Sequence, residues 1–228
     1  MRLELQKIAR GCARADKQSV RKSWPSLGDS RMLSGAILVG GASRRMGSDK
    51  VALEFNGRSL LDTVIDLVRP FVQTIALIGQ LSKDVTIGYH EPRAERGLVR
   101  LKDDSDVSGP LAGVAAALAH NSFSTWRFLP CDMPGMTREA LQWLLDRHDN
   151  RRPATVGVLP GHKRAEPFPA VYSPSANVPL RAFIRSGDTS LRRGLMSMKA
   201  TKISIPVRLT RCWRKREYAH GMGRFLAA

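Results

Sequence analysis

Apolar residues follow two alternating patterns along this chain. Continuous apolar runs predict buried strands at 36–39, 74–78, 126–131, 154–159 and 168–172. Spacings of three and four residues predict helices over 60–68 and 110–120, another behind an N-cap at Thr137, and one from Asp188 through Met196. A last strand candidate covers 203–207. Strands that alternate with helices predict an α/β fold, a mostly parallel sheet covered by helices on both faces. This is a Rossmann-like three-layer α/β/α sandwich.

The segment 40–50, Gly-Gly-Ala-Ser-Arg-Arg-Met-Gly-Ser-Asp-Lys, follows the first apolar run. Gly40 and Gly41 allow a sharp turn and a close approach of the backbone to a ligand. Exposed backbone N–H groups at such a turn can face phosphate oxygens. Arg45 and Lys50 add cationic donors that suit a polyphosphate. The alternative is a polar surface loop, but two glycines, two arginines and a lysine within eleven residues favour phosphate binding. The segment is neither a Walker A loop nor a Gly-x-Gly-x-x-Gly turn.

The segments 40–50 and 103–109 and the residue Asp132 each follow a predicted strand. Right-handed crossovers place such segments at one edge of a parallel sheet, where ligands bind beyond the carboxyl ends of the strands. We therefore expect these distant segments to converge on one crevice. Asp132, between Pro130 and Pro134, is a candidate magnesium ligand, because Mg²⁺ prefers carboxylate oxygens. By sequence alone, an aspartate that caps a turn is an equally good interpretation.

Three blocks of sequence, in order, resemble the molybdenum cofactor guanylyltransferase family. They are the segment 38–50, the segment 103–113 (Asp-Asp-Ser-Asp-Val-Ser-Gly-Pro-Leu-Ala-Gly) and the segment 128–134 (Phe-Leu-Pro-Cys-Asp-Met-Pro). A weaker fourth match is 166–172, Glu-Pro-Phe-Pro-Ala-Val-Tyr. Val39 stands where the family usually has alanine. The resemblance covers roughly residues 35 to 195.

The resemblance implies a fold of the nucleotide-diphospho-sugar transferase type and a defined reaction. GMP would pass from GTP to the terminal phosphate of molybdenum-loaded molybdopterin, forming the guanine dinucleotide cofactor and pyrophosphate. Mg²⁺ would be the cofactor, with Asp132 as its ligand. The implied catalytic residues are Arg45, Lys50 and Asp132. The implied nucleotide-binding residues are Leu38, Val39, Gly40, Gly41, Lys50, Asp132 and either Asp103 or Asp104. Molybdoenzyme-assembly proteins are further candidate partners.

The chemistry of the acceptor explains why the chain shows no convincing general base. A phosphate monoester has a second pKa of about 6 and is largely dianionic at neutral pH. The difficulty is then to bring two anions together, which Arg, Lys and Mg²⁺ solve. A carboxylate can accept hydrogen bonds from N1–H and N2–H₂ of guanine, whereas cytosine offers no such adjacent pair.

Two alternatives stay open at this stage. One is a cytidylyltransferase, or another nucleotidyltransferase, of the same architecture. The other is an inactive relative that binds nucleotides or polyanions without turnover. The second alternative rests on the C-terminus. Family members usually carry a segment like Asn-x-Asn-Thr-Pro-Glu there, and residues 208–217 have nothing similar.

The net charge of +17 is concentrated in the two ends of the chain. Residues 1–34 contribute +5 and residues 192–228 contribute +9, whereas 35–191 contribute only +3. We expect a basic extension at 1–34, a nucleotidyltransferase domain at 35–207 and a basic tail at 208–228. Basic ends attract polyanions in general, but no motif for specific nucleic-acid binding accompanies them.

The remaining composition predicts a cytoplasmic protein without a membrane partner. No apolar run approaches the roughly 18 residues of a membrane span, and no secretory h-region is visible near the N-terminus. The three cysteines lie far apart and form no metal-binding spacing, which fits reduced thiols.

Overall fold

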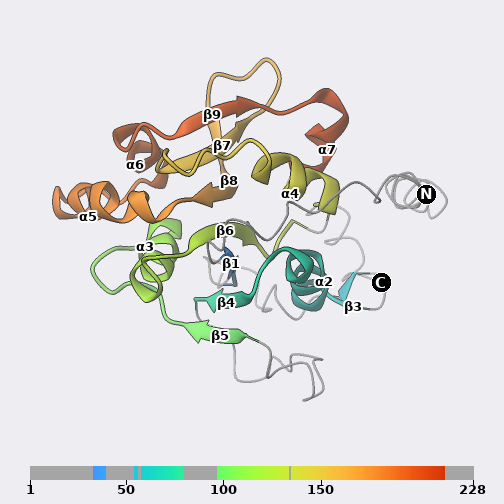
Figure 1. Ribbon diagram of the computed structural model, residues 1–228, viewed down its shortest axis with the longest axis horizontal. Helices are drawn as coiled ribbons and strands as arrows, with labels where there is room; N and C mark the ends of the chain where they lie inside the picture. Colours follow the sequence, from blue (N-terminus) through green and yellow to red (C-terminus); the bar gives the residue numbers. More distant parts are fainter. Residues whose placement is uncertain (1–32, 40–53, 56–57, 80–96, 134, 214–228) are drawn as a thin grey trace, which may run out of the picture. The chain divides into compact units, whose positions relative to one another are not determined.

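A computed structural model describes residues 33–39, 54–55, 58–79, 97–133 and 135–213 of the 228-residue chain (Figure 1). The strands are β1 (Leu33–Leu38), β2 (Glu54–Phe55), β3 (Arg58–Ser59), β4 (Thr74–Ile78), β5 (Leu98–Leu101), β6 (Thr125–Pro130), β7 (Ala154–Val158), β8 (Ala165–Tyr172) and β9 (Thr201–Ser204). The helices are α2 (Leu60–Val68), α3 (Pro110–His120), α4 (Arg138–Leu145), α5 (Asn177–Arg185), α6 (Leu191–Ser197) and α7 (Thr210–Trp213). Short 3₁₀ turns are η3 (Arg69–Phe71), η5 (Pro174–Ala176) and η6 (Val207–Leu209).

Within these residues, seven strands form one sheet in the order β5-β4-β1-β6-β8-β7-β9. Strand β8 runs antiparallel to both of its neighbours, and the other pairs in the sheet are parallel. The centre of β1 pairs on both sides, since Ala36 lies opposite Ala76 of β4 and Phe128 of β6. The mostly parallel sheet predicted from the sequence is confirmed. The chain leaves β1 toward β4 and later returns to β6 on the other side of β1, which creates a topological switch point between β1 and β6.

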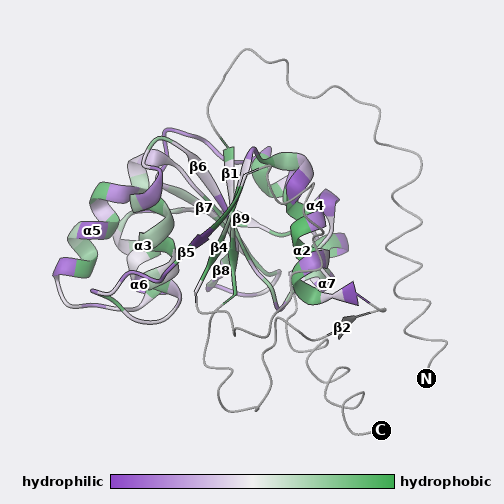
Figure 2. Ribbon diagram, turned by 90° about the horizontal axis from the view of Figure 1, so that it is seen from below, coloured by the Kyte–Doolittle hydropathy of each residue, from purple (hydrophilic) through white to green (hydrophobic). Residues whose placement is uncertain are grey.

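Helices cover both faces of the sheet (Figure 2). One buried cluster joins the sheet to α3, α5 and α6 through Leu111, Val114, Leu118, Leu180, Leu191 and Leu195. The other joins it to α2, α4 and α7 through Leu61, Val64, Ile65, Leu141, Leu144 and Trp213. The predicted three-layer architecture is therefore confirmed. No helix in the part of the chain that the structure describes combines the length and the apolar character needed to cross a lipid bilayer.

Strand β5 and helix α5 were not predicted from the sequence, and neither were the short elements β2, β3 and α7. Strand β5 is a four-residue edge strand, and such a short run gives little periodic signal. Helix α5 carries Pro179 in its first turn, where a missing N–H is tolerated but where the sequence suggests a helix boundary. A better signal for α5 was the spacing of Leu180, Phe183 and Ile184, which all face the core.

The last strand lies earlier than predicted. Strand β9 ends at Ser204, and residues 207–209 form the turn η6 instead. Pro206 explains the difference, because it lacks the N–H that would continue the ladder. Packing of the domain also continues beyond residue 207, since Leu209, Cys212 and Trp213 are buried.

Side-chain caps set the starts of α4 and α6, as Ser59 does for α2. Thr137 caps α4 as predicted, and its hydroxyl accepts a hydrogen bond from the Ala140 N–H at 3.2 Å. The cap of α6 is Ser190 rather than the predicted Asp188. Asp188 instead accepts the Ser190 N–H at 2.8 Å and pairs with Arg193, so it fixes the turn that precedes the cap.

A partly buried histidine ties the end of α4 to the sheet. The two ring nitrogens of His148 lie 2.9 Å from the hydroxyls of Thr155 on β7 and Ser173 after β8. Ser173 donates its own proton to the Arg152 carbonyl oxygen. The Nε2 atom of His148 must therefore carry the proton toward Ser173, which leaves Nδ1 to accept from Thr155. The ring is neutral in this arrangement, and burial lowers its pKa to about 4.

Because of His148, we expect the free energy of unfolding to fall in mild acid. Its pKa is about 4 in the folded protein against 6.5 for the ordinary side chain. Between these two values the unfolded chain binds the extra proton, so the stabilisation is complete above pH 6.5 and is lost as the pH falls toward 4. Urea unfolding of wild type and His148→Gln at pH values from 7.5 to 4 should show a flatter profile for the variant. His120→Gln, an exposed control, should follow the wild type; coincident profiles for wild type and His148→Gln would contradict the assignment.

Candidate functional site

Backbone hydrogen bonds hold the carboxyl ends of four parallel strands together. The Val39 N–H donates to the Ile78 carbonyl at 2.9 Å, joining the ends of β1 and β4. The Gly79 N–H donates to the Leu101 carbonyl at 3.1 Å, which joins β4 to β5. The segments that follow these strands therefore leave the sheet at one edge. The shared edge of these strand ends is as expected for a parallel sheet, and the convergence of the segments on one crevice stays a prediction.

Asp132 lies at this edge, at the switch point of the sheet. It directly follows Cys131, whose N–H donates to the Leu38 carbonyl at 3.1 Å. The chain therefore leaves the sheet at Asp132, beside the end of β1. Asp132 is half-buried. Among the described residues, no group of three or more His, Cys, Asp or Glu could hold a metal on its own. The donor set fits Mg²⁺ bound to a nucleotide, because that ion needs only one or two carboxylates when phosphate oxygens complete its shell.

The residues predicted to hold the triphosphate lie outside the described part of the chain. Gly40, Gly41, Arg45 and Lys50 all belong to residues 40–53, so their contacts stay predictions.

Leu38 and Val39 were predicted to contact the nucleotide. Leu38 is the last residue of β1, and Val39 follows it. The Leu38 side chain is buried against α3. The Val39 N–H already donates to Ile78. A contact from Val39 to a nucleotide would therefore use its carbonyl oxygen, which suits a base edge that carries N–H donors.

The Asp103 carboxylate lies near the side chains of Leu38 and Ile78, which end β1 and β4, beside the first turns of α3. Position 113 in these turns is glycine, which leaves room for the Leu38 side chain. A Cβ there would lie 2.8 Å from Leu38 Cδ2, 3.4 Å from Ile78 Cγ2 and 3.5 Å from Asp103 Oδ1. Partial burial raises the pKa of Asp103 above its usual value. The side chain stays exposed on its other side, so it can meet a ligand at the sheet edge.

Asp104 has a different environment from its neighbour. Its Oδ1 atom accepts the Asp106 N–H at 3.0 Å, and its Oδ2 atom accepts from Arg181 of α5 at 2.5 Å. The Asp104 side chain is only 10% exposed. Both carboxylate oxygens are thus engaged within the protein. The sequence left open which of the two aspartates serves the nucleotide, and the geometry favours Asp103.

Arg181 was not predicted as a site residue. It lies on the unpredicted helix α5, 77 positions from Asp104. No local pattern marks such a pair. Helical spacing around Leu180 and Phe183 could have located the helix, but only the packing of α5 against α3 brings Arg181 to the segment after β5.

Two curated relatives of this chain share one name. A molybdenum cofactor guanylyltransferase from Yersinia pestis is 29% identical over 175 residues, which is 76% of this chain and 85% of the relative. An enzyme of the same name from Shewanella putrefaciens is 28% identical over 162 residues, 70% of this chain and 78% of the relative.

Solved structures agree with the observed fold. Molybdopterin-guanine dinucleotide biosynthesis protein A from Archaeoglobus fulgidus matches with a TM-score of 0.58 and 26% identity, over 81% of this chain and 88% of its own. The 2-C-methyl-D-erythritol 4-phosphate cytidylyltransferase from Thermus thermophilus matches with a TM-score of 0.56 over 77% of this chain and 90% of its own, and at 16% identity it supports the fold alone. The predicted fold class is confirmed.

The family assignment rests on a match that spans most of the chain. The model of the MobA-like NTP transferase domain matches residues 35–201. That range contains six strands of the sheet, apart from the first two residues of β1, and it ends at the first residue of β9; it also contains Asp103 and Asp132. The chain therefore belongs to the MobA-like NTP transferase domain family and is a nucleotidyltransferase.

Proposed function

We propose that this nucleotidyltransferase transfers GMP from GTP to the terminal phosphate of molybdenum-loaded molybdopterin. The relatives that share its family carry the name of this activity. The structural observation that supports it most is the placement of two carboxylates along one sheet edge. Asp132 follows β6 beside the end of β1, and Asp103 lies over the ends of β1 and β4. One can serve the phosphates and the other the base.

Base recognition is the role proposed for Asp103. Its carboxylate can accept hydrogen bonds from N1–H and N2–H₂ of guanine, and the Val39 carbonyl can accept another. Cytosine does not present two adjacent donors, so this arrangement favours GTP over CTP.

Phosphate binding and transfer are assigned to the switch-point side of the edge. Asp132 would hold a Mg²⁺ ion, which would neutralise charge on the triphosphate. Arg45 and Lys50 would bind the β- and γ-phosphates. An oxygen of the acceptor phosphate then attacks the α-phosphorus, the bond from that phosphorus to the bridging oxygen breaks, and pyrophosphate leaves with the electron pair. No proton has to be removed from a dianionic acceptor.

The decisive experiment measures pyrophosphate release with GTP or CTP, each with and without the molybdenum-loaded pterin. We expect release only when GTP, Mg²⁺ and the pterin are all present. Equal release with CTP would support a cytidylyltransferase of the same architecture. Release without the pterin would show that the acceptor has a different chemistry.

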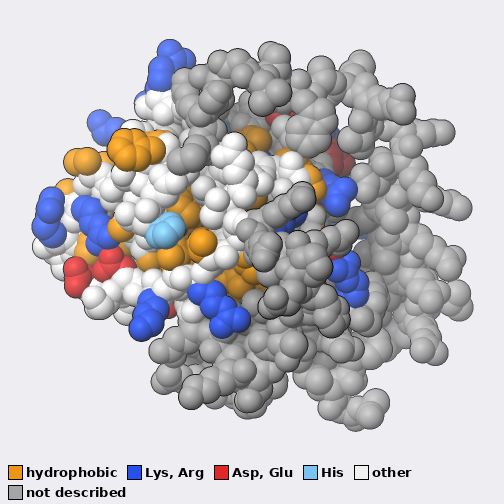
Figure 3. All heavy atoms as spheres, turned by 60° about the horizontal axis from the view of Figure 1, so that its bottom comes forward, with side chains coloured by type: hydrophobic (Ala, Val, Ile, Leu, Met, Phe, Trp, Pro, Cys, Tyr) orange, Lys and Arg blue, Asp and Glu red, His pale blue; other side chains and the backbone are white. Residues whose placement is uncertain are grey.

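The alternative is that the basic ends of the chain bind polyanions without turnover; most of their residues lie outside the described part of the chain. On the face shown in Figure 3, the Lys and Arg side chains of the described residues are dispersed rather than gathered in one patch. Thermal shifts separate the two functions: stabilisation by GTP with Mg²⁺ that exceeds that by CTP or ATP supports specific binding. An equal, strongly salt-dependent response to any polyanion would contradict it.

Lys50→Ala should weaken GTP binding about ten- to a hundredfold, because it removes a charge-assisted hydrogen bond to the triphosphate. The free energy of unfolding should change little. Titration with GTP and Mg²⁺ measures the effect, with the exposed strand residue Lys202→Ala as the control. Overlapping titrations of wild type and Lys50→Ala would show that the segment 40–50 does not bind the triphosphate.

A further inference from the structure

Arg181 links three segments that surround the proposed base site. Its guanidinium donates to Asp104 Oδ2 at 2.5 Å and lies within 3.4 Å of the Ala115 carbonyl of α3. The Arg181 side chain is 30% exposed and that of Asp104 is 10% exposed. A charge-assisted pair this well shielded from water is stronger than an exposed surface pair. Arg181 therefore connects α5 and α3 to the segment that follows β5.

The segment between β5 and α3 has few other polar attachments near Asp103, and further along it Val107 is buried in the core. Gly109, which precedes α3, has φ of +73° and offers no side-chain cap. The Asp104 N–H donates to the Ala112 carbonyl at 3.3 Å, a long bond, and Asp104 Oδ1 closes a turn with Asp106. The pair with Arg181 is the shortest of these contacts. It holds the backbone at residue 104, one residue away from the carboxylate that faces the strand ends.

We propose that Arg181 is a positioning residue, which fixes Asp103 for recognition of the guanine edge by holding Asp104. The proposal rests on the function proposed above. The two neighbouring carboxylates then have different roles. Asp104 is bound within the protein, and this holds Asp103 at the sheet edge, where it can meet the base. A shift of about 1 Å at a recognition group is enough to lower its contribution substantially. Without Arg181, the Asp104 carboxylate would turn toward solvent and carry Asp103 with it.

The test compares GTP with ITP, whose base lacks the 2-amino group. In Arg181→Gln, the KM for GTP should rise about tenfold while kcat changes little, because phosphate chemistry at Asp132 is untouched. The ratio of kcat/KM for GTP over ITP should fall toward the value for Asp103→Asn. Arg185→Gln, an exposed arginine one turn further along α5, should behave as the wild type. The midpoint of urea unfolding is recorded for each variant, because a purely structural role would move that midpoint and leave the GTP-to-ITP ratio unchanged.

Further variants distinguish a failure of the role proposed for Arg181 from a failure of base recognition by Asp103. Arg181→Lys keeps the charge and should retain part of the selectivity, and it replaces Arg181→Gln in the test if the latter does not fold. The double variant Asp104→Asn/Arg181→Gln should lose no more selectivity than either single change. A wild type that selects GTP, with Arg181→Gln selecting it equally well, overturns the role of Arg181 alone. A wild type that uses GTP and ITP alike overturns base recognition by Asp103, and this proposal with it.

Discussion

Asp132→Ala should lower metal-dependent pyrophosphate release by about a hundredfold or more while the fold is retained. The reason is electrostatic: in the proposed mechanism its carboxylate is the protein's only ligand, among the described residues, for the ion that neutralises the triphosphate. Losing one such stabilising group commonly costs about 3 kcal/mol of barrier. Asp132 lies two residues beyond the end of β6 and belongs to neither buried cluster, so removal of its side chain leaves both clusters intact.

The measurement is pyrophosphate release over a range of Mg²⁺ concentrations, with thermal unfolding recorded in parallel. Asp106→Ala is the matched control, because Asp106 is an exposed carboxylate in the segment before α3. The control should keep full activity. Undiminished release by Asp132→Ala would refute the metal site.

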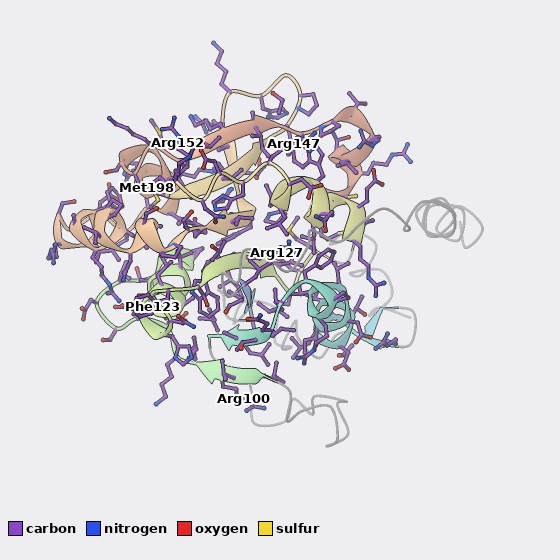
Figure 4. All side chains as sticks on the ribbon, in the orientation of Figure 1. Arg100, Phe123, Arg127, Arg147, Arg152 and Met198 are labelled. Atoms are coloured by element: carbon purple, nitrogen blue, oxygen red, sulfur yellow. The ribbon has the colours of Figure 1, made fainter. Side chains whose placement is uncertain are left out.

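Arg127→Met should make the protein more stable. Arg127 lies on β6, in register with Gly35 of β1 and Val171 of β8, and its side chain is fully buried (Figure 4). Its guanidinium stands 4.4 Å from the centre of the Phe71 ring. None of its three side-chain nitrogens has a hydrogen-bond partner among the described residues. Burial lowers the pKa of Arg127 to about 10, although the negative charge of Asp146 raises it. The guanidinium therefore stays charged at neutral pH.

A buried charge without hydrogen bonds lowers the free energy of unfolding, whereas a methionine of similar length can occupy the same space without that desolvation penalty. Replacing such groups by apolar side chains of similar volume often stabilises a protein by about 1–4 kcal/mol. Urea unfolding at pH 7.5 measures the change. The control is Arg100→Met, an exposed arginine on β5 that is also labelled in Figure 4, and it should stay within about 0.5 kcal/mol of the wild type. A lower stability for Arg127→Met would show that ordered water compensates the cation.

Elements with strong local patterns could be predicted from the sequence. The apolar runs of β1, β4 and β6 and the three- and four-residue spacing in α2 located these elements to within a few residues. The alternation of strands and helices also predicted the parallel sheet, and with it the edge on which Asp132 lies. These are features in which local propensity and global fold agree.

The remaining features depend on contacts between distant segments. The different environments of Asp103 and Asp104 follow from Arg181, which donates to Asp104 and which no spacing in the sequence could connect to it. Strand β5 is too short to show a period, and its place at the sheet edge depends on pairing with β4. The burial of Trp213 depends on contacts with residues far along the chain, including Trp143, whose ring centre lies 5.9 Å away at nearly a right angle.

The reversed direction of β8 has a consequence for how this architecture can diversify. Because β7 and β8 are antiparallel neighbours, a short turn joins them, and it rises from the same rim as Asp132. Gly161, with φ of +75° and open space around its α-carbon, lies in that turn. Extra residues inserted there would lengthen the rim without displacing any helix of either layer. Insertions at this single hairpin would therefore change the lining of the edge beside Asp132 while both helical layers stay in place.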